Sequence, residues 1–328
     1  MYQMMSLPLY SGTLGEYNSW RDLGQELERL GCDGIEGVWG GEDLPKDLPA
    51  ELILGYHLIF YPDWLDFYRD DRAALKQKFG SLEVTASFYG GLGPDTLLEQ
   101  YRADLRRAVN LGARYVVFHV SDVSLEEGYT YRWLHTNQEV IDAAVEVVNL
   151  ILGEERWPFK FLVENQWWPG FTFTEPEETA RLLEGIRFAG KGILLDTGHL
   201  MNACTELKTE AEGADYIRRM LNRHGSLAKW VRGVHLHQSL SGAYVKAHTG
   251  SLPAGLPEDY MERFGVSYQH ILQIDQHRPW TDPAILSVLE QIEPRYLTHE
   301  LSSRGRMARA EAVSVQTRLL QQGGRMRV

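Results

Sequence analysis

Short apolar runs alternate with segments of helical periodicity along most of the chain. The runs predict strands at residues 7–10, 34–38, 53–57, 82–87, 115–120, 161–164, 192–196, 231–235 and 296–301. Helical periods lie between them, for example at residues 19–30, 94–111, 138–152, 175–186 and 282–292. Strands that alternate with helices form βαβ units and a parallel sheet. Nine candidates compete for eight places, so we expect one to be irregular and the rest to close into a (β/α)8 TIM barrel.

Size and composition agree with one such domain over residues 1–328. The hydrophobic fraction of 44% and the charged fraction of 24% are ordinary for a globular protein. No apolar stretch approaches the roughly 20 residues of a membrane span, and the first residues lack the features of a signal peptide. Cys32 and Cys204 cannot form a disulfide framework, so we expect a cytoplasmic location. The net charge of −12 disfavours a nucleic-acid partner, because phosphates bind clustered Lys and Arg.

The longest stretch without clear periodicity covers residues 236–274 and contains several Gly and Pro residues. A long βα loop inside a compact domain is usually a lid or a binding loop. In a barrel, the loops that follow the strands build the catalytic face. We therefore predict that this segment is an irregular loop that covers the functional site.

Four predicted strands end in an ionisable group directly after apolar residues. These groups are Glu164, Asp196, His235 and Glu300. Burying such a group is costly unless it is paired or bound to a metal, and the carboxyl ends of parallel strands meet on one face. Three carboxylates and one imidazole suit Zn, Mn or Fe. The alternative is four unrelated polar residues, each hydrogen-bonded to its neighbours.

Other residues extend this candidate site. Possible ligands are His57, His119, His199 and the pair Asp275 and His277, although an Asp-x-His step alone is a weak signal. Possible substrate contacts are Trp167, Trp168, His237 and His248. The two tryptophans could stack on a planar or sugar-like ligand, or pack beneath a lid. We interpret the remaining histidines as core or surface groups.

Taken together, these residues resemble the xylose-isomerase-like TIM barrels, a superfamily of sugar isomerases and epimerases that also holds endonuclease IV. The resemblance covers residues 50–301. Its isomerases imply one divalent metal held by Glu164, Asp196, His235 and Glu300. Endonuclease IV implies three zinc sites: His57, His119 and Glu164; then Glu164, Asp196, His235 and Glu300; then His199, Asp275 and His277. The interval from His235 to Asp275 is longer here than in that enzyme, so His248 competes for the third site.

The resemblance leaves three functions open. The one we favour is a metal-dependent hydrolase of a small phosphoester, with up to three zinc ions and with Glu164 bridging two of them. One similar branch acts on the nucleotide loop of cobamides. The second is a sugar isomerase or epimerase with a single Mn or Mg, in which Glu164 and Glu300 shuttle protons and His199 positions a hydroxyl. The third is a non-catalytic binding barrel. The basic loops with which the nuclease enters DNA are absent, and the sequence does not predict an oligomeric state.

Overall fold

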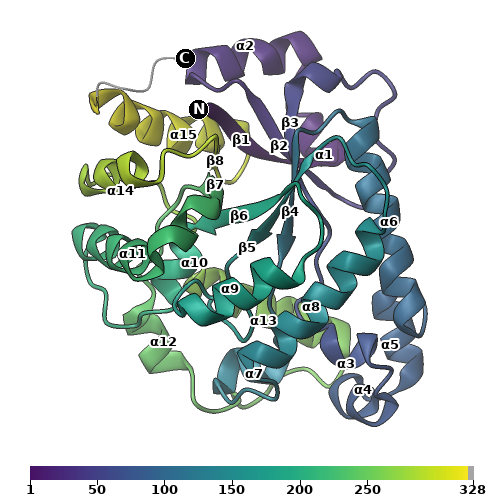
Figure 1. Ribbon diagram of the computed structural model, residues 1–328. Coiled ribbons are helices and arrows are strands. Elements are labelled where there is room, and N and C mark those ends of the chain that lie inside the picture. The colour runs from purple at the N-terminus through teal and green to yellow at the C-terminus, as the bar shows by residue number, and fades with distance from the viewer. Residues whose placement is uncertain (324–328) are drawn as a thin grey trace.

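Eight parallel strands close into a barrel in the computed structural model, which describes residues 1–323 (Figure 1). Each strand pairs with its neighbours in the sequence, and β8 pairs with β1 to complete the ring. The strands are β1 (Tyr2–Leu9), β2 (Gly34–Trp39), β3 (Ile53–His57), β4 (Tyr115–His119), β5 (Lys160–Glu164), β6 (Lys191–Asp196), β7 (Val231–His235) and β8 (Tyr296–His299). The predicted (β/α)8 barrel is confirmed.

Helices cover the outside of the barrel, and shorter helices lie in the connections at its ends. They are α1 (Ser11–Leu14), α2 (Trp20–Leu30), α3 (Leu65–Tyr68), α4 (Arg72–Phe79), α5 (Leu82–Tyr89), α6 (Pro94–Asn110), α7 (Leu125–Thr130), α8 (Asn137–Leu152), α9 (Pro176–Gly185), α10 (Thr197–Asn202), α11 (Glu210–His224), α12 (Gly242–His248), α13 (Tyr260–Ile274), α14 (Ala284–Ile292) and α15 (Arg306–Gln322). Within residues 1–323, none has the length and apolar character that crossing a bilayer requires.

One of the nine predicted strands is wrong. Residues 82–87 lie in helix α5, which begins after Ser81, whose hydroxyl accepts the N–H of Val84. Such a cap satisfies a donor that a helix start would otherwise leave free. Thr85 and Tyr89 are the buried residues of α5, and their spacing of four is that of a helix. The apolar composition of this segment was therefore not enough to distinguish a strand from a short helix.

The prediction that residues 236–274 are irregular is also wrong, because α12 and α13 occupy much of this segment. Asp259 caps α13 by accepting the N–H of Glu262. Tyr260, Phe264 and Ile271 then recur at helical spacing, a signal that the preceding Gly and Pro residues obscured. Helix α13 contacts both α7 and α12, and Figure 1 shows the three together at the barrel end away from the N-terminus.

The side chains inside the barrel change character along the strands. Alternate residues of a strand point to the same face. An inner layer of apolar side chains includes Val117, Leu162 and Leu194, all buried. Two residues further along the same strands stand His119, Glu164 and Asp196. Strand alternation therefore carries these ionisable groups to the carboxyl end of the barrel.

Candidate metal centre

The first group of converging side chains comes from the ends of β3, β4 and β5. His57 Nε2 and His119 Nε2 lie 3.0 Å apart. Glu164 Oε2 lies 3.4 Å from the first nitrogen and 3.3 Å from the second. His57 Nδ1 donates to the carbonyl oxygen of Leu58 at 2.8 Å, which leaves Nε2 as the ligand nitrogen. Two imidazoles and a carboxylate oxygen thus face one another closely, as zinc ligands do.

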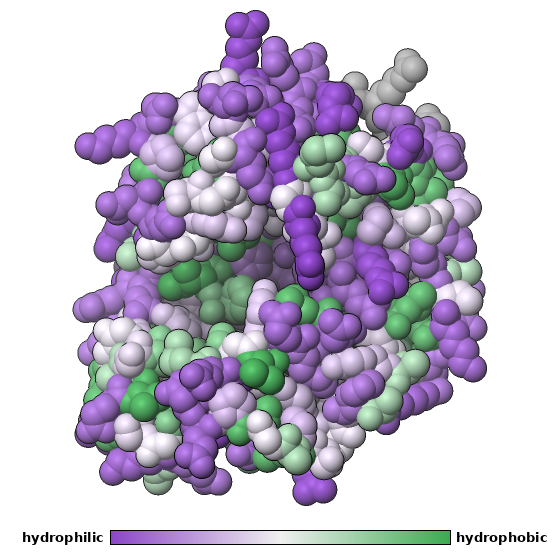
Figure 2. Space-filling model, turned by 180° about the vertical axis from the view of Figure 1, so that it is seen from behind, coloured by the Kyte–Doolittle hydropathy of each residue, from purple (hydrophilic) through white to green (hydrophobic). Residues whose placement is uncertain are grey.

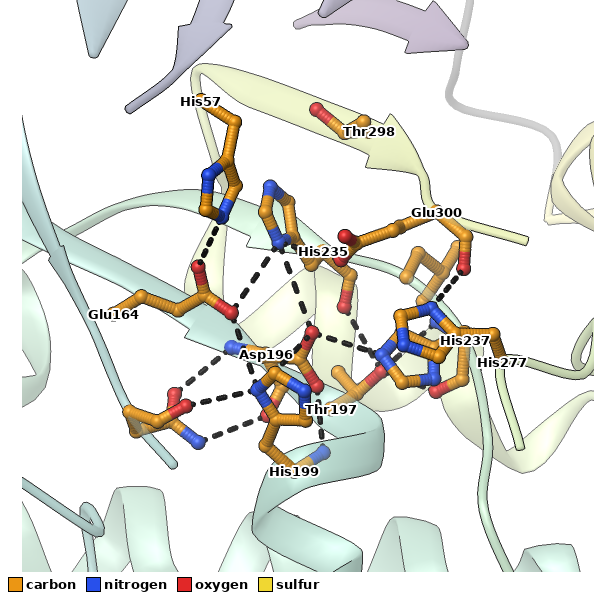
Figure 3. A network of polar contacts seen from close by, with 12 residues as sticks. His57, Glu164, Asp196, Thr197, His199, His235, His237, His277, Thr298 and Glu300 are labelled. Carbon is orange, nitrogen blue, oxygen red and sulfur yellow. Dashed lines mark hydrogen bonds and ion pairs between the residues drawn. The ribbon is translucent and has the colours of Figure 1, made fainter. Parts of the chain in front are cut away.

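The second group surrounds one nitrogen of His235, at the end of β7 (Figure 3). His235 Nδ1 lies 2.7 Å from Glu300 Oε2, 3.6 Å from Glu164 Oε1 and 3.7 Å from Asp196 Oδ2. Glu164, Asp196 and His235 are completely buried, whereas 18% of the Glu300 side chain is exposed. Three carboxylates at one buried position repel one another unless positive charge lies between them.

The third group joins α10 to the segment after α13. Asp275 Oδ2 lies 3.3 Å from His199 Nε2 and 2.5 Å from His277 Nε2. The ring of His237 stacks on that of His277 with 4.1 Å between centroids, so His237 belongs to this group as well. His277 has a φ of +46°, in the left-handed region that costs a non-glycine residue ~1–3 kcal/mol. In each of the three groups, the candidate ligand atoms lie within 4.8 Å of one another.

Several buried polar atoms in these groups form no hydrogen bond of acceptable geometry, although His235 Nδ1 and Glu300 Oε2 lie 2.7 Å apart as an ion pair. They are Glu164 Oε2, His235 Nδ1, His237 Nδ1, Asp275 Oδ1 and Glu300 Oε2. Buried polar atoms nearly always form hydrogen bonds in folded proteins, so five such atoms without one in a single site require an explanation. A divalent cation in each group would accept the free lone pairs of these nitrogens and oxygens. The donor set therefore fits bound metal ions.

The ionisation of the groups favours the same conclusion. Burial alone would raise the pKa of Glu164, but His119 and His235 beside it hold that pKa well below its usual value. Burial would also raise the pKa of Glu300, but the neighbouring His235 outweighs this effect and lowers that pKa to about 2. At His277, burial is outweighed by Asp275, which raises the imidazole pKa to about 9. The carboxylates are therefore ionised at neutral pH, and a bound metal must displace protons from histidine.

The sequence model of the xylose isomerase-like TIM barrel matches residues 25–313, which is most of the chain. The chain belongs to this family. No curated protein matches it. This member of the family is similar in fold to endonuclease IV from Thermus thermophilus, with 16% identity, a TM-score of 0.55, and 98% of this chain and 100% of that one covered.

Two further similar structures carry other activities in their names. L-ribulose 3-epimerase has 13% identity and a TM-score of 0.54, with 99% of this chain and 96% of the other covered. Mannonate dehydratase from Streptococcus suis serotype 2 has 14% identity and a TM-score of 0.53, with coverages of 99% and 94%. Proteins that share this fold thus carry names of several reaction classes, and identities this low show the fold alone.

Glu36 is a site residue that the sequence reasoning missed. It is fully buried in β2, and its Oε1 accepts from His235 Nε2 at 2.8 Å. Its Oε2 accepts from Tyr115 Oη at 2.5 Å and from Thr298 Oγ1 at 3.0 Å. A carboxylate on one ring nitrogen fixes the histidine tautomer and directs the other nitrogen to a metal. An acidic residue within an apolar strand was the available signal, but it stands in mid-strand rather than at an end.

The Asp196-Thr-Gly-His199 step orients several of the candidate ligands. Asp196 caps α10, its Oδ1 accepting the N–H of His199 at 2.6 Å. Thr197 Oγ1 donates to the carbonyl oxygen of His237 at 2.6 Å. A Cβ on Gly198 would lie 2.0 Å from Cε1 of His237, so only glycine allows that ring to approach. One short segment therefore positions ligands of two groups.

The predicted substrate contacts divide in two. Trp167 and Trp168 are buried in the loop after β5, and the Trp167 ring lies 5.1 Å from that of His199. His248 is exposed on α12, with Nδ1 3.0 Å from the carbonyl oxygen of Tyr244. Among the described residues it lies outside the three groups and outside the cavity lining, so Asp275 and His277, rather than His248, join His199.

Proposed function

We propose that this protein is a divalent-metal-dependent hydrolase of a small phosphoester, most favourably a phosphodiester, with zinc as its metal. The position of Glu164 carries the proposal. Its Oε2 faces His57 and His119, whereas its Oε1 lies 3.1 Å from His199 Nδ1 and 3.6 Å from His235 Nδ1. The two oxygens of this one carboxylate thus lie beside different sets of ligands, as expected of a residue that bridges two closely spaced ions.

The residues take separate roles in this proposal. His57, His119 and Glu164 would hold the first ion, and Glu164, Asp196, His235 and Glu300 the second. His199, Asp275 and His277 would hold the third, with His237 as an additional candidate. Clustered divalent ions supply Lewis-acid chemistry, in that they activate water and stabilise charge on the attacking and leaving oxygens.

The chain itself supplies orientation and a dry site. Leu58 and Glu36 hold the rings of His57 and His235 through their second nitrogens. Trp167, next to His199, shields that side of the centre from water. Glu300 lines the cavity and keeps part of its side chain exposed, so the ion that it would help to hold is open to the substrate.

A sugar isomerase or epimerase is the second candidate. The second group alone could hold one Mn or Mg, and Glu164 and Glu300 both lie there beside His235, where two proton-transfer groups would be needed. This alternative gives no metal role to His57 and His119, whose ring nitrogens lie only 3.0 Å apart. The number of bound ions therefore separates the two candidates.

Elemental analysis of protein purified without chelator tests the choice. We expect more than one zinc ion per chain, and the loss of about one ion when His57 and His119 are both changed to Ala. His248→Ala is the matched control, because His248 is exposed on α12, and it should keep every ion. A single Mn or Mg per chain, unaffected by the double substitution, would contradict the multi-zinc site and favour the isomerase instead.

Duplex DNA is not the substrate in this proposal. The chain carries a net charge of −12, and no Lys or Arg stands among the described residues that line the cavity. Binding to an abasic-site duplex at physiological salt should therefore be weak, with a shallow dependence on salt concentration. Tight binding with a steep salt dependence would restore a DNA-repair function.

A further inference from the structure

A cavity of about 700 Å³ adjoins the candidate metal centre. Side chains of all three groups line its inner end, among them His119, Glu300 and Asp275. Its outer wall comes from the loop after β3, the loop after β5, and α13. On the face that Figure 2 shows, the surface is hollowed near its centre and hydrophobic side chains gather along one side of the hollow. A volume of several hundred Å³ is that of a small-molecule site.

The outer wall is dominated by apolar and aromatic side chains. They include Phe60, Trp167, Trp168, Phe264, Tyr268 and Ile271. Because the described lining has no Lys or Arg, an anionic part of a ligand finds positive charge only at the inner end, where metal ions would lie. The two ends of the cavity therefore suit two different parts of one molecule.

Three of the large apolar side chains in this wall are open to solvent. Phe60 is 48% exposed, and Met261 and Tyr268 are each 52% exposed. Phe60 also stands directly at the first group, with its ring centroid 4.5 Å from that of His119. Exposed apolar surface that is concentrated around a cavity marks a surface that a ligand covers. The apolar wall is thus continuous with the candidate metal ligands.

We propose that the substrate carries a planar, mainly apolar ring system, which occupies this cavity while its phosphoester lies at the metal centre. The inference rests on the proposed phosphoesterase function and specifies its substrate class. A free sugar or sugar phosphate presents hydroxyls on all sides, and the aromatic wall would leave most of them without partners. The ring system would pack against the apolar wall, and the anionic ester would lie at the inner end, where metal ions would supply positive charge.

Calorimetric titration of the zinc-loaded protein with non-hydrolysable probes tests this substrate class. The probes are naphthylmethylphosphonate, methylphosphonate and naphthalenemethanol, which carry both parts, the anion alone and the ring alone. We expect the first to bind at least about tenfold more tightly than the second, because it buries its ring. Tyr268→Ala should remove most of that difference and leave the affinity for methylphosphonate within about twofold.

The matched control is Val266→Ala, since Val266 is 45% exposed on the same helix as Tyr268 but lies outside the described cavity lining. It should preserve the tenfold difference. Equal affinities for the two phosphonates, or tighter binding of D-fructose than of the naphthyl probe, would overturn the inference while phosphoester hydrolysis could stand. Binding of naphthalenemethanol that depends on Tyr268, without binding of either phosphonate, would support the ring site and overturn the phosphoesterase.

Discussion

Replacing Glu36 by Gln tests whether the barrel interior sets the metal-binding tautomer of His235. Glu36 accepts on both oxygens: Oε1 from His235 Nε2, and Oε2 from Tyr115 and Thr298. Glutamine offers one acceptor and one donor. If the amide oxygen keeps the hydrogen bonds from Tyr115 and Thr298, the NH₂ group faces His235 Nε2, and that nitrogen must then accept a hydrogen bond from it. The ring proton moves to Nδ1, the atom that faces Glu164, Asp196 and Glu300.

The expected loss follows from this rearrangement. Either the proton occupies the ligand position on Nδ1, or the amide turns and two buried hydroxyls lose their acceptor. A hydrogen bond to a charged group contributes ~1.5–3 kcal/mol. Removing the outer partner of a ligating histidine typically weakens metal binding about 10–100-fold, or roughly 1.4–2.7 kcal/mol. The two estimates agree, so we expect zinc in the second group to bind about 10–100-fold more weakly.

Competition with a chromophoric zinc chelator measures this affinity. The matched control is Tyr115→Phe, which deletes one hydroxyl bond to Glu36 but leaves the carboxylate on His235. It should lose about 1.5–3 kcal/mol of folding stability, because the lost bond is to a carboxylate, and retain zinc affinity within about threefold. Wild-type zinc affinity in Glu36→Gln would refute the tautomer argument. So would an equal loss in Tyr115→Phe, because the effect would then come from packing.

Three further outcomes are expected. Glu164→Gln should reduce hydrolysis by at least about 10²-fold. Circular dichroism and the melting temperature of the metal-free protein should show a retained fold, because Glu164 lies at the carboxyl end of the barrel rather than in its apolar layer. Activity near wild type would exclude Glu164 from the reaction. Lys78→Met should cost about 3–5 kcal/mol in urea unfolding. Lys78 Nζ lies 2.7 Å from both Asp63 and Asp66, and its loss leaves the buried Asp63 without a cation, whereas Asp66 keeps His135. Lys76→Met, at an exposed position on the same helix, should cost less than about 0.5 kcal/mol. Burial lowers the pKa of His299 to about 3, so the unfolded chain, with a pKa near ~6.5, binds the proton more readily and stability falls as the pH drops below about 6.5. Between pH 7.5 and 5.5 the loss of folding free energy from this group amounts to about 1.4 kcal/mol. His299→Gln should lose less stability than wild type over this range, by about that amount. An unchanged pH dependence in the variant would contradict the prediction.

The sequence alone determined the architecture and the candidate ligand positions. Alternating apolar runs and helical periods are local signals, and they predicted the barrel and all of its strands within a few residues, apart from a later start for β1. An ionisable group at the end of a buried strand is also a local signal. In a parallel barrel it fixes the face on which the group lies, which is why Glu164, Asp196 and His235 could be grouped before the structure was known.

Other features depended on contacts that no local pattern encodes. Residues 82–87 could be a strand or a helix until Ser81 was seen to cap them. Glu36 acquires its role through His235, which lies 199 residues away in the sequence, and His237 joins the third group by stacking on His277. Helix α13 forms a cavity wall only because it folds back against α7. Periodicity tells which face a side chain takes, but the register between strands and the docking of loops decide which atoms meet.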